Sequence, residues 1–238
     1  MAVKVFSSQV VGLKADIVDV EVDLTNGLHS FSIVGLPDKA VEEAKDRVCA
    51  AIKNSGFVSP KTRNQKVVVS LAPAEIKKEG PVFDLSIAMA YLLASKQVFF
   101  ESEGKIFLGE LALDGKIRSI KGVLSLVKNA KKLGFKEIFL PKDNAKEAAL
   151  IDDINIFACE KLEDITNHFD KENTINLIAQ PKTEINFDEF QNEILFDFGD
   201  VKGQETAKRG LEIAAAGGHN VMMSGPAGTG KTMLAKAF

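Results

Sequence analysis

A glycine-rich segment, residues 225–232, constrains the fold of this chain more than any other stretch. It reads Gly-Pro-Ala-Gly-Thr-Gly-Lys-Thr and fits the pattern G-x-x-x-x-G-K-[ST]. An apolar run at residues 220–224 precedes it, and strong helix formers follow from Met233. Glycines let the backbone turn so tightly that successive N–H groups point at phosphate oxygens, and a following helix adds its own free N–H groups. The segment therefore predicts a strand, a phosphate-binding loop and a helix, in that order.

The residues of this loop have separate roles in nucleotide binding. We expect Lys231 to neutralise the β- and γ-phosphates of ATP, and the Thr232 hydroxyl to ligate the accompanying Mg²⁺. The backbone of the other loop residues would surround the phosphates: Gly225, Pro226, Ala227, Gly228, Thr229 and Gly230. The alternative is a glycine-rich surface turn with an exposed lysine, which leaves the flanking apolar run and helix formers unexplained.

Composition is that of an ordinary globular protein. The 238 residues include 30 Lys and Arg against 33 Asp and Glu, which gives a net charge of −3. No apolar run approaches the ~20 residues of a membrane span, so we expect no membrane partner. Cys49 and Cys159 lack metal-ligand spacing and suit a reducing, cytoplasmic location. The mild acidity gives no electrostatic footprint for nucleic acid, so any DNA contact would need a local basic patch.

Residues 1–170 alternate strand and helix signals, and we expect one compact α+β domain. Alternating apolar and acidic residues predict a half-buried strand at residues 18–22, and further strands are predicted at residues 31–34, 67–71, 138–140 and 154–157. Apolar faces at helical spacing predict helices at residues 37–55, 84–95, 122–133 and 162–169. Asp84 is expected to cap the second of these helices, and Asp114-Gly115 to close a hairpin formed by residues 105–119.

Residues 171–197 differ in composition from both flanks. They are rich in acidic residues and show no long periodic element, which predicts an acidic linker with a short helix at residues 188–195. After the linker, residues 205–216 indicate a helix ended by Gly217-Gly218. The linker would thus separate the first domain from a second segment, residues 198–238.

Three segments of the first domain are similar to the proteolytic domain of Lon-type proteases. Residues 78–81 resemble the start of the K-D-G-P-S-A-G nucleophile loop of those enzymes. Residues 109–117 resemble the hairpin that follows it, and residues 140–144 a later [IL]-P-x-x-N segment. The order of the three segments matches, and the resemblance implies a Lon-like (ribosomal-protein-like) fold.

The chemistry of Lon is missing at the matching positions. Val82 stands where the resemblance places the nucleophilic serine, and Leu124 where it places the lysine. A Ser–Lys dyad needs a hydroxyl and an amine that takes its proton, and neither aliphatic group can do this. Ser86 and Lys78 are possible substitutes in the sequence, but Ser86 fits better as a polar residue near a helix start. We therefore expect a scaffold or contact surface and no protease activity.

The second segment resembles the magnesium-chelatase-like branch of the AAA+ ATPases. Residues 198–209 are similar to its F-x-D-V-x-G-Q-x-x-A-K-R motif, and residues 217–220 precede the phosphate loop at the family's spacing. The resemblance implies an α/β P-loop domain, of which residues 198–238 are the truncated beginning. It also implies that Val201 and Gly203 lie against the adenine. With a dyad-free Lon-like domain in front, the chain is identified as a member of the ComM/YifB family.

Membership of this family implies the N-terminal fragment of an ATP-driven motor. Such proteins assemble as homo-oligomeric rings, as hexamers, and ComM-type members are associated with DNA remodelling, notably branch migration during natural transformation. Hydrolysis needs an acidic residue and a neighbour's arginine, which we expect beyond Phe238, so we expect ATPase activity of the full-length protein only. Two alternatives stay open: a metal-chelatase-type motor subunit, and a non-enzymatic interaction module gated by nucleotide.

Overall fold

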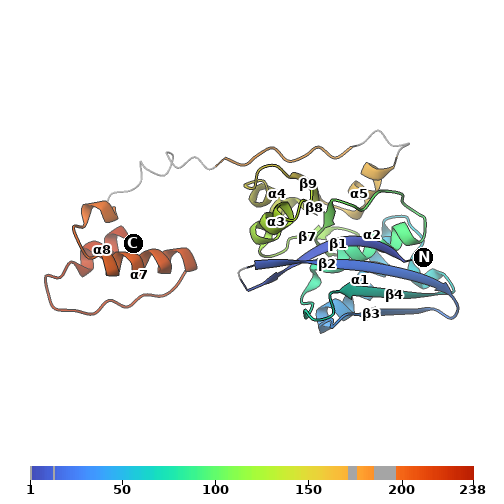
Figure 1. The fold of residues 1–238 in the computed structure, drawn as a ribbon, viewed down its shortest axis with the longest axis horizontal. Coiled ribbons are helices and arrows are strands. Elements are labelled where there is room, and N and C mark those ends of the chain that lie inside the picture. Colours follow the sequence, from blue (N-terminus) through green and yellow to red (C-terminus); the bar gives the residue numbers. More distant parts are fainter. Residues whose placement is uncertain (1, 13, 171–175, 185–196) are drawn as a thin grey trace. The chain divides into compact units, whose positions relative to one another are not determined.

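A computed structural model describes residues 2–12, 14–170, 176–184 and 197–238. The chain divides into two compact units, Met1–Thr183 and Glu184–Phe238, and Figure 1 shows the elements of each. The division falls inside the stretch that composition marks as a linker. The short helix expected at residues 188–195 lies outside the described residues.

A mixed seven-stranded sheet forms the centre of the first unit. Its strands are β1 (Val3–Val11), β2 (Lys14–Asn26), β3 (Ser30–Val34), β4 (Gln65–Ala72), β5 (Lys105–Phe107), β8 (Glu137–Pro141) and β9 (Asn155–Cys159). They lie in the order β3-β4-β2-β1-β5-β8-β9. β1 pairs antiparallel with β2, and β2 with β4, whereas all other neighbours in this sheet are parallel. The fold is therefore mixed α/β, and parallel pairs are in the majority.

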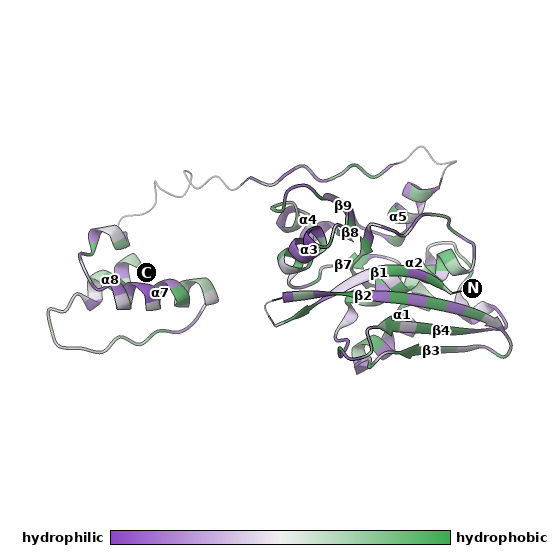
Figure 2. Ribbon diagram, in the orientation of Figure 1, coloured by the Kyte–Doolittle hydropathy of each residue, from purple (hydrophilic) through white to green (hydrophobic). Residues whose placement is uncertain are grey.

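Apolar clusters on both faces of this sheet hold the helices of the unit. The helices are α1 (Lys39–Asn54), α2 (Asp84–Ala94), α3 (Val123–Lys132), α4 (Lys142–Ala148) and α5 (Leu162–Phe169), with 3-10 turns η1 (Pro60–Thr62) and η2 (Pro81–Phe83). Phe139 of β8 belongs to one cluster, with α1 and α2, whereas Ile138 and Leu140 belong to the other, with α3 and α4. Because successive strand residues point to opposite faces, the clusters lie on opposite sides of the sheet. Along β2, hydrophilic and hydrophobic residues alternate (Figure 2).

Most predicted elements of this unit are confirmed. The expected strands overlap β2, β3, β4, β8 and β9, and the expected helices overlap α1, α2, α3 and α5. The sequence does not predict β1, because residues 5–9 of this central strand are all buried and so do not alternate. Its polar residues bond to backbone: the Ser7 hydroxyl donates to the Phe107 carbonyl (3.1 Å), and the Ser8 hydroxyl to the Asp16 carbonyl (2.8 Å).

The predicted hairpin at residues 105–119 is wrong in its first strand. Residues 105–107 form β5, which pairs parallel with β1 and β8 in the large sheet. Only the inner part is a hairpin, in which β6 (Glu110–Leu111) pairs antiparallel with β7 (Ile117–Arg118). The turn does contain Asp114-Gly115, and Gly115 has a left-handed φ of 86°. The turn residues determine where the chain bends, but the partner of a strand depends on distant segments.

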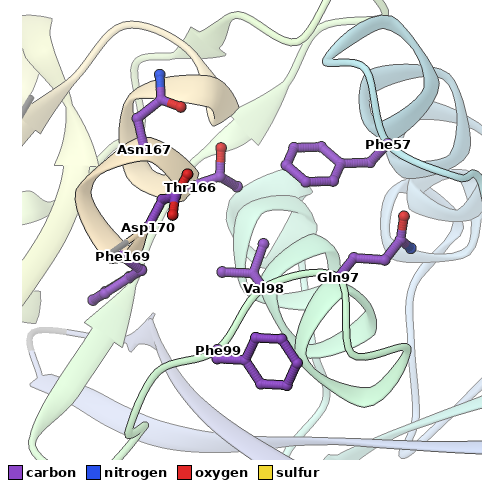
Figure 3. Close-up of a pocket in the computed structure, with 8 residues that line it drawn as sticks. All are labelled: Phe57, Gln97, Val98, Phe99, Thr166, Asn167, Phe169 and Asp170. Carbon is purple, nitrogen blue, oxygen red and sulfur yellow. The ribbon is translucent and has the colours of Figure 1, made fainter. Parts of the chain in front are cut away.

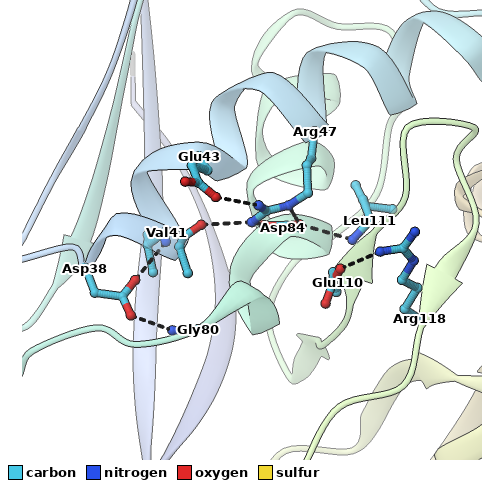
Figure 4. A network of polar contacts seen from close by, with 10 residues as sticks. Asp38, Val41, Glu43, Arg47, Gly80, Asp84, Glu110, Leu111 and Arg118 are labelled. Atoms are coloured by element: carbon cyan, nitrogen blue, oxygen red, sulfur yellow. Dashed lines mark hydrogen bonds and ion pairs between the residues drawn. The ribbon is translucent and has the colours of Figure 1, made fainter.

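Asp84 does not cap α2 as predicted. The residue lies inside the helix, and its fully buried carboxylate accepts hydrogen bonds from Arg47 Nε (2.6 Å), Arg47 Nη2 (3.0 Å) and the N–H of Leu111 (3.1 Å), as Figure 4 shows. These bonds join α1, α2 and β6. Burial raises the pKa of Asp84 to about 6, even though the Arg47 guanidinium acts in the opposite direction.

Residues 177–183 lie on the first unit, although the sequence places them in a linker. Ala179 forms an antiparallel bridge with Phe157 of β9. The Gln180 N–H donates to the carbonyl of Ile156 (2.7 Å). The first unit therefore extends past the boundary that composition suggests, because backbone pairing at a sheet edge leaves no signature in composition.

The second unit is small in its described part. It contains η3 (Phe198–Asp200), α7 (Glu205–Gly217) and α8 (Lys231–Ala237). Val201, Leu211 and Leu234 form its buried apolar cluster. The helix predicted at residues 205–216 is confirmed as α7. The strand predicted at residues 220–224 is wrong in this structure, because the segment pairs with no described residue and a strand needs a hydrogen-bonded neighbour.

Candidate functional site

The phosphate loop closes around the side chain of its own lysine. Lys231 Nζ donates hydrogen bonds to the carbonyl oxygens of Gly225 (2.8 Å) and Pro226 (2.7 Å). The Thr229 hydroxyl donates to the Pro226 carbonyl (3.0 Å). The ammonium group is thus held by the backbone of the loop, where a phosphate group in the loop would meet it.

Two glycines give the loop its shape. Gly228 and Gly230 have φ values of 81° and 83°, conformations that are costly for residues with a Cβ. Gly230 directly precedes α8, which begins at Lys231, two residues before the helix formers that indicate it in the sequence. Thr232 lies in the first turn of α8 and is exposed, so its hydroxyl is accessible to a metal ion beside the phosphates.

A cavity of about 560 Å³ adjoins the loop. Four of the predicted loop residues line it: Gly225, Pro226, Thr229 and Lys231. The other lining residues are Gln204, Ala207, Gly210, Leu211, Val221, Met222, Met223, Ser224 and Leu234. The contribution of α7 to this cavity is not predicted by the sequence motifs. One feature of the sequence could have indicated it: the small residues Ala207 and Gly210 stand three positions apart and therefore share one face of the helix.

The two residues that the resemblance places against adenine lie in different environments. Val201 is 6% exposed and packs with Leu211 and Leu234 in the apolar cluster of the unit. Gly203 is exposed, has a φ of 71°, and precedes Gln204, which lines the cavity. Neither Val201 nor Gly203 lines the cavity in this structure, so their contact with a base stays a prediction.

The chemistry of the cavity fits a polyphosphate. Among the described residues that line it, Lys231 is charged and none is a carboxylate. A nucleoside triphosphate would meet the ammonium group and the glycine backbone of the loop, and the Thr232 hydroxyl could ligate Mg²⁺. Hydrolysis needs in addition an acidic residue that holds Mg²⁺ and an arginine that stabilises the transferred phosphoryl group. The described residues that line the cavity therefore suit phosphate binding and do not complete a hydrolytic site.

The two alternative dyad residues of the first unit do not form a catalytic pair. Ser86 is buried in α2, and its hydroxyl donates to the carbonyl of Phe83 (2.8 Å). The Lys78 amine is buried too and donates to the carbonyl of Pro73, and this burial lowers its pKa. Among the described residues, no hydroxyl is hydrogen-bonded to Lys78. Both side chains therefore serve the structure of this unit.

A hollow in the first unit is lined by a mixture of aromatic and polar residues, as Figure 3 shows. Its volume is about 370 Å³, and Phe57, Phe99 and Phe169 contribute to its walls. Gln97 at its side is fixed, because its Oε1 accepts a hydrogen bond from the N–H of Val58 (2.7 Å). Its described lining contains no cysteine or histidine, and the hydroxyl of Thr166 donates a hydrogen bond to the backbone carbonyl of Glu163 (3.1 Å). Among the described residues that line it, no base is paired with that hydroxyl, so the hollow lacks the nucleophile–base pair of a catalytic site.

Two models of known protein families match the chain. A family model described as subunit ChlI of Mg-chelatase matches residues 20–144, and a second, described as magnesium chelatase, subunit ChlI, matches residues 197–238. The chain belongs to the ChlI family of magnesium-chelatase-like proteins. The second match includes the whole phosphate loop, and the first covers more than half of the chain, within the first unit.

Individual relatives show the type within this family. The chain is 40% identical over 234 residues to competence protein ComM from Haemophilus influenzae, covering 97% of the chain and 45% of ComM. It is 41% identical over 225 residues to YifB from Escherichia coli, covering 94% of the chain and 42% of YifB. The chain is thus of the ComM/YifB type and spans less than half the length of these relatives. A Lon protease from Leptospira interrogans is 26% identical over 134 residues, 56% of the chain and 16% of that protease.

Proposed function

We propose that the second unit forms the phosphate-binding part of an ATP site in a ComM/YifB-type AAA+ motor. The supporting observation is the Lys231 ammonium group, held by the carbonyls of Gly225 and Pro226 beside a cavity of about 560 Å³. Bound Mg²⁺-ATP would supply the phosphoryl group whose transfer drives the motor. Lys231 and the loop backbone would hold its phosphates, and Thr232 its metal ion.

The activity of the whole protein extends this proposal. The similarity to a competence protein supports DNA remodelling, and a ring of identical subunits, a hexamer, would supply the arginine that each site needs from its neighbour. Among the described residues no helix is both long and apolar enough to cross a membrane. The first unit would act as a Lon-like scaffold or contact surface, a role that the partial similarity to a Lon protease supports.

Substitution of Lys231 in the full-length protein tests the motor directly. We expect Lys231→Ala to abolish ATP turnover and the migration of branched DNA, because the phosphates lose the cation that the loop provides for them. The exposed Lys236 of α8 lies outside the loop and the cavity lining, so Lys236→Ala serves as the matched control and keeps both activities. Unchanged turnover in Lys231→Ala would refute the proposal.

A chelatase-type motor is the second candidate, because both matching family models are described by the magnesium chelatase subunit. It predicts nucleotide-dependent insertion of Mg²⁺ into a porphyrin by the full-length protein with its partner subunits, and no effect of branched DNA on ATP turnover. A third hypothesis, an interaction module gated by nucleotide, predicts that the protein binds ATP without hydrolysing it. Turnover that is stimulated by branched DNA, with no metal insertion, favours the DNA motor over both.

A further inference from the structure

An interior glycine of α7 has no evident role in the fold. Gly210 lies in the middle of α7 (Glu205–Gly217) and, unlike Gly203 and Gly218, it does not have a positive φ. Glycine in a helix interior is unfavourable relative to alanine, because it loses more backbone freedom on folding. A helical glycine with an ordinary φ therefore needs another explanation.

Packing within the protein does not supply that explanation. A Cβ at Gly210 would meet no atom within 4 Å outside the neighbouring backbone of its own helix. Gly217 at the end of α7 differs, because a Cβ there would run into the ring of His219. The protein thus has space at Gly210 for a side chain, and that space is part of the cavity beside the phosphate loop.

The position of Gly210 connects it with the proposed nucleotide site. Gly210 and Ala207 line the cavity from the same helix face, and Gly225 and Lys231 line it from the phosphate loop. Two small residues three positions apart leave a flat strip of backbone on the α7 side. A surface with a single methyl group at Ala207 and no side chain at Gly210 suits a planar ring, which gains contact with many atoms at once.

We propose that Gly210 determines specificity for a nucleoside triphosphate: the base would lie against the backbone of α7 at this glycine while the loop holds the phosphates. This proposal rests on the proposed nucleotide site. It adds a contact for the base, which is the group that a nucleotide has and inorganic polyphosphate lacks. Glycine is the residue that permits the closest approach of a ligand to backbone. A side chain at this position would occupy the space of the base without touching the loop.

Binding of two ligands to the full-length protein tests this assignment. The ligands are Mg²⁺-ATP and Mg²⁺-tripolyphosphate, which lacks a base, and both affinities are measured by titration calorimetry. We expect Gly210→Leu to weaken ATP binding by about tenfold or more, the range for a steric change in a ligand pocket, and to leave tripolyphosphate binding within about twofold. Ala215→Leu adds the same side chain to an exposed site of α7 outside the cavity lining and should change neither affinity.

A second variant removes loss of folding as an explanation. Alanine favours a helix more than glycine does, so Gly210→Ala should raise the melting temperature of the second unit while it weakens ATP binding by a few-fold. Unchanged ATP affinity in Gly210→Leu, or an equal loss for both ligands, overturns the inference. The proposed nucleotide site fails in a different way: tripolyphosphate would then not bind, or Lys231→Ala would leave its binding unchanged.

Discussion

The two units of this chain bury their side chains to very different extents. In the first unit, two apolar clusters cover opposite faces of a seven-stranded sheet, and an ion pair with the buried Asp84 joins α1 to α2. In the second, the described apolar cluster consists of Val201, Leu211 and Leu234 with a few partly buried neighbours. In the first unit, which has the large core, Ser86 and Lys78 form no catalytic pair. The candidate phosphate-binding site lies in the second unit, which has the small core. Binding of a ligand to the second unit should therefore contribute much of its stability.

The largest expected difference between the units is the cost of a core truncation. Phe139 is fully buried in the first unit, so Phe139→Ala should lower its free energy of unfolding by about 3–5 kcal/mol. Leu211→Ala in the second unit should leave that transition unchanged, because the units have separate cores. Fluorescence of Tyr91, the single tyrosine in a chain without tryptophan, reports the urea unfolding of the first unit. A shift of the Tyr91 transition by Leu211→Ala would show that the two units unfold together.

The next contrast is between two arginines in ion pairs. Arg47 is 19% exposed and pairs with the fully buried Asp84, whereas Arg209 is 74% exposed and pairs with Glu212. Arg47→Ala leaves a buried carboxylate without its cation and should cost about 2–3 kcal/mol, below the ~3–5 kcal/mol of a fully buried pair. Arg209→Ala should cost less than about 0.5 kcal/mol. Equal effects of the two substitutions on urea midpoints would contradict the importance of burial.

The smallest of the three effects is a pH dependence that belongs to the first unit. The pKa of Asp84 is raised from 3.8 to about 6 in the folded state, mainly by burial. Between pH 4 and 6 the folded state thus binds more protons than the unfolded state, and the contribution of Asp84 to stability falls as pH rises through this window. Compared with Asp84→Asn, which does not titrate, the wild type should lose about 2 kcal/mol between pH 4 and 7. A constant difference between the two proteins across this range would contradict the raised pKa.

Local sequence patterns predict much of the fold, and their failures have a common cause. The amphipathic segment that becomes α1 and the alternating strand β2 are predicted, because their periodicity is set by neighbours in sequence. β1 is missed because it is central and buried on both faces, and β5 is assigned to the wrong partner. Asp84 is of a residue type that often caps helices, and it stands at the start of one. Its carboxylate pairs instead with Arg47, which is distant in sequence, and the local pattern does not indicate this partner.

The candidate site likewise has parts that the local sequence predicts and parts that it does not. The motif at residues 225–232 predicts a tight loop followed by a helix, and the structure has a loop with left-handed Gly228 and Gly230 before α8. The roles of Lys231 and Thr232 in binding ATP and Mg²⁺ stay predictions. The cavity wall on α7 is not predicted, because which face of a helix meets the loop depends on packing around Leu211 and Leu234.

The sequence by itself determined the identity of the loop residues, the type of most helices and strands, and the absence of a serine and a lysine at the two dyad positions. These are properties of residues within a few positions of one another, and glycine conformations, periodicity and side-chain chemistry decide them. The tertiary structure alone decided the strand order, the burial of Asp84 and Lys78, and the place of Gly210 on the cavity wall. Each of these depends on contacts between residues far apart in the chain, and such contacts leave no local pattern to read.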